Sequence, residues 1–157
     1  MGLKPRPGQP FPMKSIHSQI QIHATAEKVW QVLTDLNAYP QWNPFITSAK
    51  GEILTGSRLR IRIAPPGSKA MTFRPIITAV DPGCELRWRG RLLLPGLFDG
   101  EHIFKIQPLD GNRILFVQAE NFTGLLVPLV WGKLNAGTRQ GFELMNTALK
   151  RTIEEGV

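Results

Sequence analysis

The sequence predicts an α+β domain in which a curved, seven-stranded antiparallel sheet packs against a long C-terminal helix. Three observations lead to this class. A strand followed by a short helical segment opens the folded part, and the middle of the chain alternates apolar and polar residues between turns. The C-terminal segment then returns to a helical period. The apolar face of such a sheet and the apolar stripe of the helix bury each other.

Length and composition fit a single domain. The chain has 157 residues, 42% of them hydrophobic and 20% charged. Residues 1–14 hold four prolines and no periodicity, so we expect an extended arm there and one domain over residues 15–157. The N-terminus lacks the apolar core of a signal peptide, and the single Cys84 excludes an internal disulfide. We therefore expect a cytoplasmic protein.

The first elements are a strand over Ile16–Ile22 and a short amphipathic helix. Thr25 is the predicted N-cap of this helix. Its apolar stripe consists of Ala26, Val29, Trp30 and Leu33. The pair Tyr39-Pro40 is expected to end the element, because a residue before proline disfavours helical geometry. A second helical turn then leads to the next strand, so two short helices separate the first two strands.

Six further strands are predicted, each bounded by turn residues. They cover Ile46–Leu54, Leu59–Ile63, Met71–Val80, Leu86–Leu92, Phe98–Gln107 and Arg113–Asn121. The turns include Asp81-Pro82-Gly83 and Asp110-Gly111, both strong turn sequences. Together with the first strand these segments form an antiparallel meander.

The C-terminal helix is expected to run from Val127 to about Ile153, with one apolar face. The opposite face, which we expect to be exposed, carries Lys133, Gln140, Glu143, Asn146, Lys150 and Glu154. Gly137 and Gly141 lie on or beside the inner face. Glycine inside a helix is costly, so these positions indicate either a close approach to the sheet or room for a ligand.

Several segments carry a resemblance to a known family. They are Ala26–Trp30, Thr34–Leu36, Tyr39–Phe45, Val80–Gly83, Leu86–Trp88, Phe98–Phe104 and Phe142–Asn146. With this order of elements, the chain resembles the START-like or SRPBCC superfamily of helix-grip proteins, in particular its bacterial polyketide cyclase/dehydrase branch. The resemblance covers about residues 16–154 and implies a START-like domain. It indicates the fold more strongly than the function, because relatives include lipid carriers, hormone receptors, allergens and aromatases.

Three connections should meet at one end of the sheet. They are Pro65–Ala70, Leu92–Phe98 and Asn121–Val130, and the last two are unusually apolar. The apolar loops either pack on each other or form a rim that gates a cavity or contacts a membrane. Transient membrane contact would use Leu92–Phe98 and Leu125–Trp131. The helical pair around Trp30 and Trp42 would close the opposite end, so a site is expected at the far rim.

Polar candidates for the site lie on two neighbouring strands. His102 shares a strand face with Phe104, and Gln118 and Glu120 share one with Phe116. His102 and Glu120 could form a satisfied buried pair, orient a ligand, or act as an acid/base pair. The predicted ligand-binding set is Phe73, Trp88, His102, Phe104, Phe116, Gln118, Glu120, Trp131, Leu134 and Thr138.

Other chemistries lack a motif. The sequence has no Gly-rich phosphate loop, no zinc-ligand spacing and no nucleophile elbow, so neither a metal nor a cofactor is expected. The net charge is +7, but Arg58, Arg60 and Arg62 alternate with apolar residues, as do Arg87, Arg89 and Arg91. Such a pattern is typical of a solvated outer face. It lacks the interleaved aromatics of a nucleic-acid groove, so no nucleic-acid partner is expected.

Three functions remain open. The favoured one is binding or transport of a hydrophobic small molecule, namely a lipid, an isoprenoid or a polyketide-like aromatic, between sheet and helix. The alternative is a cyclase/dehydratase that uses His102 and Glu120. The second alternative is an interaction module of the co-chaperone kind that binds a protein through the basic face of the sheet and the apolar rim. The chain is expected to be a monomer or a homodimer.

Overall fold

The computed structural model describes residues 13–92, 94 and 96–156. Residues 1–12 of the predicted arm lie outside the described residues, and the first strand begins at Lys14. The strands are β1 Lys14–Ile22, β2 Ile46–Lys50, β3 Arg60–Ile63, β4 Met71–Phe73, β5 Ile76–Asp81, β6 Glu85–Leu92, β7 Phe98–Leu109 and β8 Arg113–Thr123. The helices are α1 Ala26–Thr34, a 3-10 turn Leu36–Ala38, α2 Tyr39–Trp42 and α3 Val127–Glu155.

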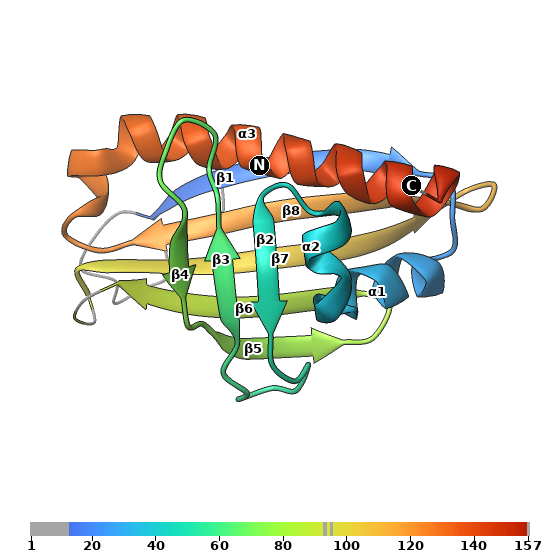
Figure 1. The fold of residues 1–157 in the computed structure, drawn as a ribbon, viewed down its shortest axis with the longest axis horizontal. Helices are drawn as coiled ribbons and strands as arrows, with labels where there is room; N and C mark the ends of the chain where they lie inside the picture. The colour runs from blue at the N-terminus through green and yellow to red at the C-terminus, as the bar shows by residue number, and fades with distance from the viewer. Residues whose placement is uncertain (1–12, 93, 95, 157) are drawn as a thin grey trace.

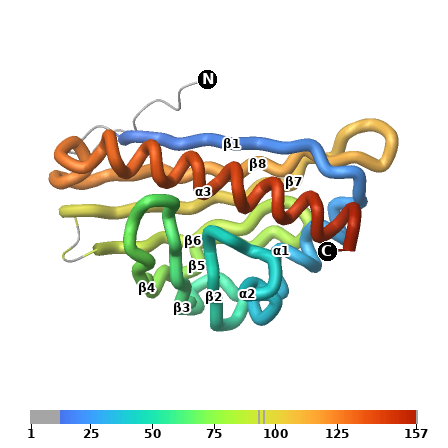
Figure 2. Tube along the Cα trace, turned by 45° about the horizontal axis from the view of Figure 1, so that its top comes forward, coloured from blue at the N-terminus to red at the C-terminus, as the bar shows by residue number. Residues whose placement is uncertain are grey.

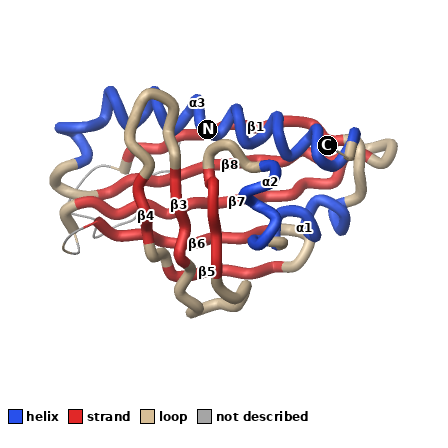
Figure 3. The backbone as a smooth tube through the Cα atoms, viewed as in Figure 1, coloured by secondary structure: helices blue, strands red, loops and turns tan. Residues whose placement is uncertain are grey.

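The strands form two antiparallel sheets. The large sheet has the order β1-β8-β7-β6-β5, and the small sheet has the order β2-β3-β4. The strands of the small sheet run across those of the large sheet (Figure 1, Figure 3). Helix α3 extends along the large sheet beside β1 and β8 (Figure 2). This arrangement confirms the predicted α+β helix-grip class.

One predicted strand is in fact two. The segment Met71–Val80 divides at Arg74-Pro75 into β4 and β5, which belong to different sheets, so the described residues form eight strands rather than seven. Pro75 has no N–H to donate, which ends one ladder and allows the chain to turn into the other. The sheets stay connected at this corner, because the N–H of Leu59 donates to the carbonyl of Pro75 at 2.8 Å.

The helical pair differs from expectation at its proline. Thr25 is the N-cap, as predicted, and its hydroxyl accepts from the N–H of Lys28 at 3.2 Å. Tyr39, however, is helical (φ −52°, ψ −42°), and Pro40 lies in the first turn of α2. Proline is tolerated there because its missing N–H would have no partner in the helix. Pro40 therefore helps to start α2 and does not end the element before it.

The inner face of α3 carries a buried polar residue besides its apolar stripe. Phe142, Met145 and Leu149 are fully buried, as the apolar stripe predicts. Asn146, which the sequence places on the exposed side, is only 2% exposed. It is buried because its amide hydrogen-bonds to Gln118 and Ser18 of the large sheet. A polar residue within a polar helical face can thus point inward when the sheet supplies its partners.

The two helix glycines serve different purposes. A Cβ built on Gly141 would lie 2.2 Å from Cδ2 of Phe45, so only glycine permits this approach. Gly137 contacts Pro65 more loosely and borders an open volume. Close packing and free space, the two alternatives for these glycines, therefore occur one turn apart. Within the described part of the chain, no helix combines the length and apolarity needed to cross a membrane.

Candidate ligand-binding site

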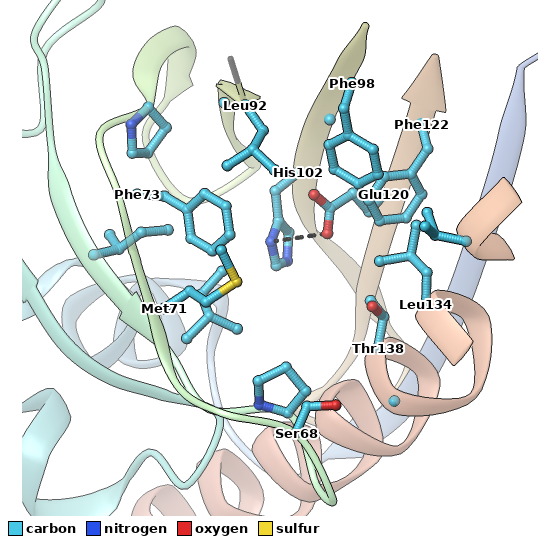
Figure 4. A pocket seen from close by; sticks show the side chains of 18 of the residues that line it. Ser68, Met71, Phe73, Leu92, Phe98, His102, Glu120, Phe122, Leu134 and Thr138 are labelled. Carbon is cyan, nitrogen blue, oxygen red and sulfur yellow. Dashed lines mark ion pairs between the residues drawn. The ribbon is translucent and has the colours of Figure 1, made fainter. Parts of the chain in front are cut away.

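A cavity of about 360 Å³ lies between the two sheets and the N-terminal half of α3 (Figure 4). Strands β3 and β4 with their connection form one wall, and β6, β7 and β8 form the opposite wall. The third wall is α3 from Leu126, its N-cap, to Thr138. The volume falls in the range of about 300–1,000 Å³ that is typical of small-molecule sites.

Two glycines create the free space above the large sheet. Gly90 of β6 and Gly100 of β7 are direct partners in the ladder, and both line the cavity. A Cβ on Gly100 would lie 2.7 Å from Oε1 of Glu120, whereas the nearest atom to a Cβ on Gly90 is Cβ of Pro75 at 3.9 Å. Gly100 therefore makes room for the Glu120 carboxyl, and Gly90 leaves the neighbouring volume empty.

Aromatic rings close the inner end of the cavity. Phe45 meets Phe142 edge to face, with ring centroids 5.8 Å apart. The ring of His102 lies 5.0 Å from Phe142 and 5.4 Å from Trp88. Gly141 lets the Phe45 ring pack directly against α3. The space between helix and sheet is therefore filled by packed side chains on the C-terminal side of Phe45 along α3, and it is open as the cavity on the N-terminal side.

A polar pair faces this apolar space. His102 and Glu120 are register partners on β7 and β8, and Nδ1 of His102 lies 3.8 Å from Oε2 of Glu120 (Figure 4). The His102 side chain is buried, while that of Glu120 keeps 16% of its surface exposed. Glu120 is therefore the member of the pair that a ligand can reach more easily.

Burial makes both members of the pair neutral near pH 7. It lowers the pKa of His102 to about 3, and the hydrogen bond between His102 and the side chain of Gln118 opposes this shift only in part. Burial also raises the pKa of Glu120 to about 8. The 3.8 Å approach is thus a contact between a neutral imidazole and a protonated carboxyl, although the two groups lie within ion-pair distance.

A hydrogen-bonded chain behind the cavity orients His102. Nε2 of His102 lies 2.9 Å from Oε1 of Gln118, and Nε2 of Gln118 donates to Oδ1 of Asn146 at 2.8 Å. Asn146 in turn donates to the hydroxyl of Ser18 at 3.1 Å. Because the Gln118 amide nitrogen is committed to Asn146, its oxygen accepts from Nε2–H of His102. Nδ1 then presents a lone pair toward Glu120.

The predicted site residues divide into three groups. Those that line the cavity are Phe73, Trp88, His102, Glu120, Leu134 and Thr138. Phe104, Phe116 and Gln118 are fully buried behind His102, whose ring stacks on Phe104 at 4.2 Å. Trp131 does not line the cavity either: it covers Phe122, and the ammonium of Lys14 lies 5.7 Å from its ring centroid.

Sequence reasoning missed several lining residues. Gly90 and Gly100 had a usable signal, because glycine in a strand interior often marks a close approach or free space. Met71, Lys69 and Lys133 had none, since an exposed methionine or lysine at a cavity mouth has the same sequence pattern as one elsewhere on the surface. Lining residues that are also exposed mark the mouth. They are Ser68, Lys69, Met71, Arg91, Val130 and Lys133.

The two apolar connections pack on each other through their backbones. The N–H groups of Leu125 and Leu126 donate to the carbonyls of Gly96 and Leu97 at 3.0 and 2.9 Å. Leu129 nevertheless remains 80% exposed and Leu125 54% exposed. The loops are thus joined to each other and still present apolar side chains to solvent.

Arg60, Arg62 and Cys84 do not line the cavity. Arg60 and Arg62 are exposed on the small sheet. Cys84 is exposed in the turn between β5 and β6. Among the described residues, no group of three or more His, Cys, Asp or Glu side chains is placed to hold a metal ion.

Comparisons with known proteins agree with this architecture. The family model described as polyketide cyclase/dehydrase and lipid transport matches residues 13–155. No curated protein matches the sequence. The structure of Zhui aromatase/cyclase from Streptomyces sp. R1128 has a TM-score of 0.74 at 18% identity, covering 92% of this chain and 98% of that one.

Two further structures show the same likeness. A START superfamily protein from Mycobacterium smegmatis has a TM-score of 0.69 at 24% identity, covering 91% of this chain and 99% of its own. Truncated norcoclaurine synthase from Thalictrum flavum has a TM-score of 0.69 at 16% identity, covering 92% and 96%. At these identities the structural likeness shows a shared fold, whose members differ in function.

Proposed function

The chain belongs to the polyketide cyclase/dehydrase and lipid transport family, and from this premise we propose that its cavity binds a hydrophobic small molecule. Lipids, isoprenoids and polyketide-like aromatics are the candidate classes. The observation that carries the proposal is a largely apolar cavity of about 360 Å³ with the polar pair His102 and Glu120 at its wall. Apolar burial supplies affinity at about 25 cal/mol per Å².

The polar pair gives the ligand its orientation. Glu120 carries its proton near pH 7 and is partly exposed to the cavity, so its hydroxyl can donate to a ligand carbonyl or hydroxyl oxygen. His102 is held in one tautomer by Gln118 and offers Nδ1 as an acceptor. An apolar ligand with one such oxygen would bind in a single direction.

A fluorescence titration tests this proposal. The fluorescence of the neutral apolar dye N-phenyl-1-naphthylamine should increase when it binds to the purified protein. Gly90→Val places a side chain in the free volume and should weaken binding at least tenfold while the protein stays folded. Thr78→Val, an exposed position on β5, is the matched control and should bind normally. Absence of dye binding by the unmodified protein would contradict the proposal.

Acid–base catalysis on such a ligand is the second candidate. The protonated Glu120 carboxyl could donate to a ligand oxygen while Nδ1 of His102 accepts a proton, as a cyclase or dehydratase acting on a poly-β-ketone requires. Glu120→Gln keeps the shape but removes the acid. If the function is catalytic, this variant should retain ligand binding and lose turnover of a poly-β-ketone substrate. Equal turnover by the variant would exclude this role.

Membrane contact through the apolar loops would give a hydrophobic ligand a route to the cavity. Leu125 and Leu129 are exposed close to Val130, which lies at the cavity mouth. Leu129→Glu should reduce co-sedimentation with vesicles of neutral and anionic phospholipid. Leu144→Glu, at another exposed leucine of α3, is the control and should leave it unchanged. Equal sedimentation of both variants and the unmodified protein would contradict this contact.

A further inference from the structure

Two lysines lie at the mouth of the cavity on opposite walls. Lys69 belongs to the connection between β3 and β4, and Lys133 belongs to α3; both line the cavity and both are exposed. The walls meet close by, because a Cβ on Gly137, one turn after Lys133, would contact Cβ of Pro65 at 3.6 Å. Lys69 and Lys133 therefore border the same cavity from two walls that approach each other.

These lysines differ from most cations of the neighbouring large sheet, which have acidic partners. On its outer face, Arg87 and Lys105 approach Glu85, and Arg89 approaches Glu101. At the cavity itself, Arg91 lies 3.5 Å from Asp99.

Among the described residues, no acidic side chain lies within ion-pair distance of Lys69 or Lys133. Glu120, on the wall formed by the large sheet, supplies the only carboxyl that the described residues place in the cavity lining. Its proton makes it neutral near pH 7. The mouth thus carries positive charge that no acidic group of the described residues pairs with, and the interior beyond it is largely apolar.

This combination selects one class of ligand. An uncharged hydrocarbon would gain nothing from the two exposed lysines, and a fully polar anion would gain nothing from the apolar interior. A molecule with an apolar body and one acidic end satisfies both regions, because a charge at the mouth stays partly hydrated while the body is buried.

We propose that the ligand is an amphipathic acid whose carboxylate or phosphate group lies between Lys69 and Lys133 while its apolar body occupies the cavity. The inference rests on the proposed function and names the ligand class for that same site. It assigns Lys69 and Lys133 as residues that determine specificity for an acidic head group.

Competition between ligands of equal chain length tests the assignment. Dodecanoic acid, dodecyl phosphate and dodecanol are each titrated against the neutral naphthylamine dye bound to the purified protein. Both acids should bind at least about fivefold more tightly than dodecanol at low salt, and the preference should shrink as salt screens the lysines. Whichever acid is preferred shows whether a carboxylate or a phosphate fits the mouth better.

Charge reversal identifies the residues. The double variant Lys69→Glu/Lys133→Glu should lose the preference for the acids and keep its affinity for dodecanol. Lys28→Glu/Lys50→Glu makes the same change in net charge at exposed lysines outside the cavity lining and should keep the preference. Lys69→Gln/Lys133→Gln serves as the milder variant if the reversal impairs folding, and it should also lose the preference.

The outcomes separate the two proposals. Equal affinity for dodecanol and the acids, or an undiminished preference in both Lys69/Lys133 variants, would overturn the head-group assignment and leave hydrophobic binding intact. Failure of all three ligands and of the dye to bind would overturn the proposed function itself, and the head-group assignment with it.

Discussion

Nε2 of His102 donates to Oε1 of Gln118 at 2.9 Å, and this bond determines which nitrogen of the imidazole carries the proton. The direction follows from Asn146, whose oxygen already accepts from the Gln118 amide. A residue on α3 thus sets the tautomer of a residue on the cavity wall. The acceptor face that His102 turns toward Glu120 depends on this chain.

Asn146→Ala should therefore destabilise the protein and disturb His102. The change leaves the buried amide of Gln118 without its acceptor, which should lower the free energy of unfolding by about 1–3 kcal/mol in chemical denaturation. It also frees Gln118 to turn over, so the ¹⁵N NMR shifts of the His102 ring should show the second tautomer. Ser18→Ala removes only the last bond and should cost about 1 kcal/mol or less. An Asn146→Ala protein with unchanged stability and ring shifts would contradict this role.

The buried pair should give stability a distinctive pH profile. Folding shifts the pKa of Glu120 from 4.5 to about 8 and that of His102 from 6.5 to about 3. Between pH 6.5 and 8 the folded state holds one more proton than the unfolded state. As the pH rises through this range, the pair's contribution to the free energy of unfolding should therefore fall by up to about 1.4 kcal/mol per pH unit. Between pH 4.5 and 6.5 both states hold one proton, and the contribution should be flat. Below pH 4.5 the unfolded state holds more protons than the folded state, so the pair's contribution to stability should fall as the pH is lowered.

Glu120→Gln isolates the carboxyl in this profile. Without it, the loss of stability above pH 6.5 should disappear, because neither state of the variant binds a proton there. Below pH 6.5 stability should fall with acid, since only unfolded His102 then gains a proton. Urea denaturation at about one-unit pH intervals measures both proteins. Identical slopes above pH 6.5 would show that Glu120 is ionised in the folded protein.

Two glycines of α3 provide a matched test of the approach of Phe45. Gly141→Ala should lower the free energy of unfolding by about 1–3 kcal/mol, because the new Cβ would lie 2.2 Å from the Phe45 ring. Gly132→Ala meets nothing within 4 Å and should raise stability by about 0.5–1 kcal/mol through helix propensity. Thermal denaturation compares the two variants. If Gly141→Ala were as stable as Gly132→Ala, the separation of core and cavity at Phe45 would be wrong.

A second glycine pair tests the position of the Glu120 carboxyl beside Gly100. Gly100→Ala should displace this carboxyl, since its Cβ would lie 2.7 Å from Oε1, and should cost about 1–3 kcal/mol of stability. Gly90→Ala, its direct partner in the ladder, has 3.9 Å to its nearest atom and should change stability by less than about 1 kcal/mol. Chemical denaturation measures both. Equal effects would show that the carboxyl does not occupy this position.

Local pattern was sufficient for most of the fold. Residues alternate between a buried and an exposed face along β6, β7 and β8, and α3 has one buried stripe. The period of apolar residues in a sequence indicates which face of an element is buried, so these elements could be predicted. The break at Pro75 was missed because apolar residues continue through it. Periodicity does not show that a strand changes sheets, and only the missing N–H of proline gave a hint.

The site was less accessible to sequence reasoning. The faces of His102 and Glu120 follow from strand alternation, but Asn146 was misplaced because a polar residue on a helix is assumed to face water. Phe104 shares a strand face with His102, which predicts it at the cavity, and Trp131 fits either core or cavity wall; the cavity lining contains neither. Where the free volume lies depends on Phe45, Gly90 and Gly100, which belong to three elements whose distances no local pattern reports.

Native mass spectrometry of freshly purified protein tests the central claim most directly. The account predicts a population heavier than the chain by the mass of one small molecule, which solvent extraction releases and identifies as apolar with an acidic end. Gly90→Val should lose this population, and Thr78→Val should keep it. A protein that carries no small molecule and takes up neither dye nor dodecanoic acid would contradict hydrophobic binding in this cavity.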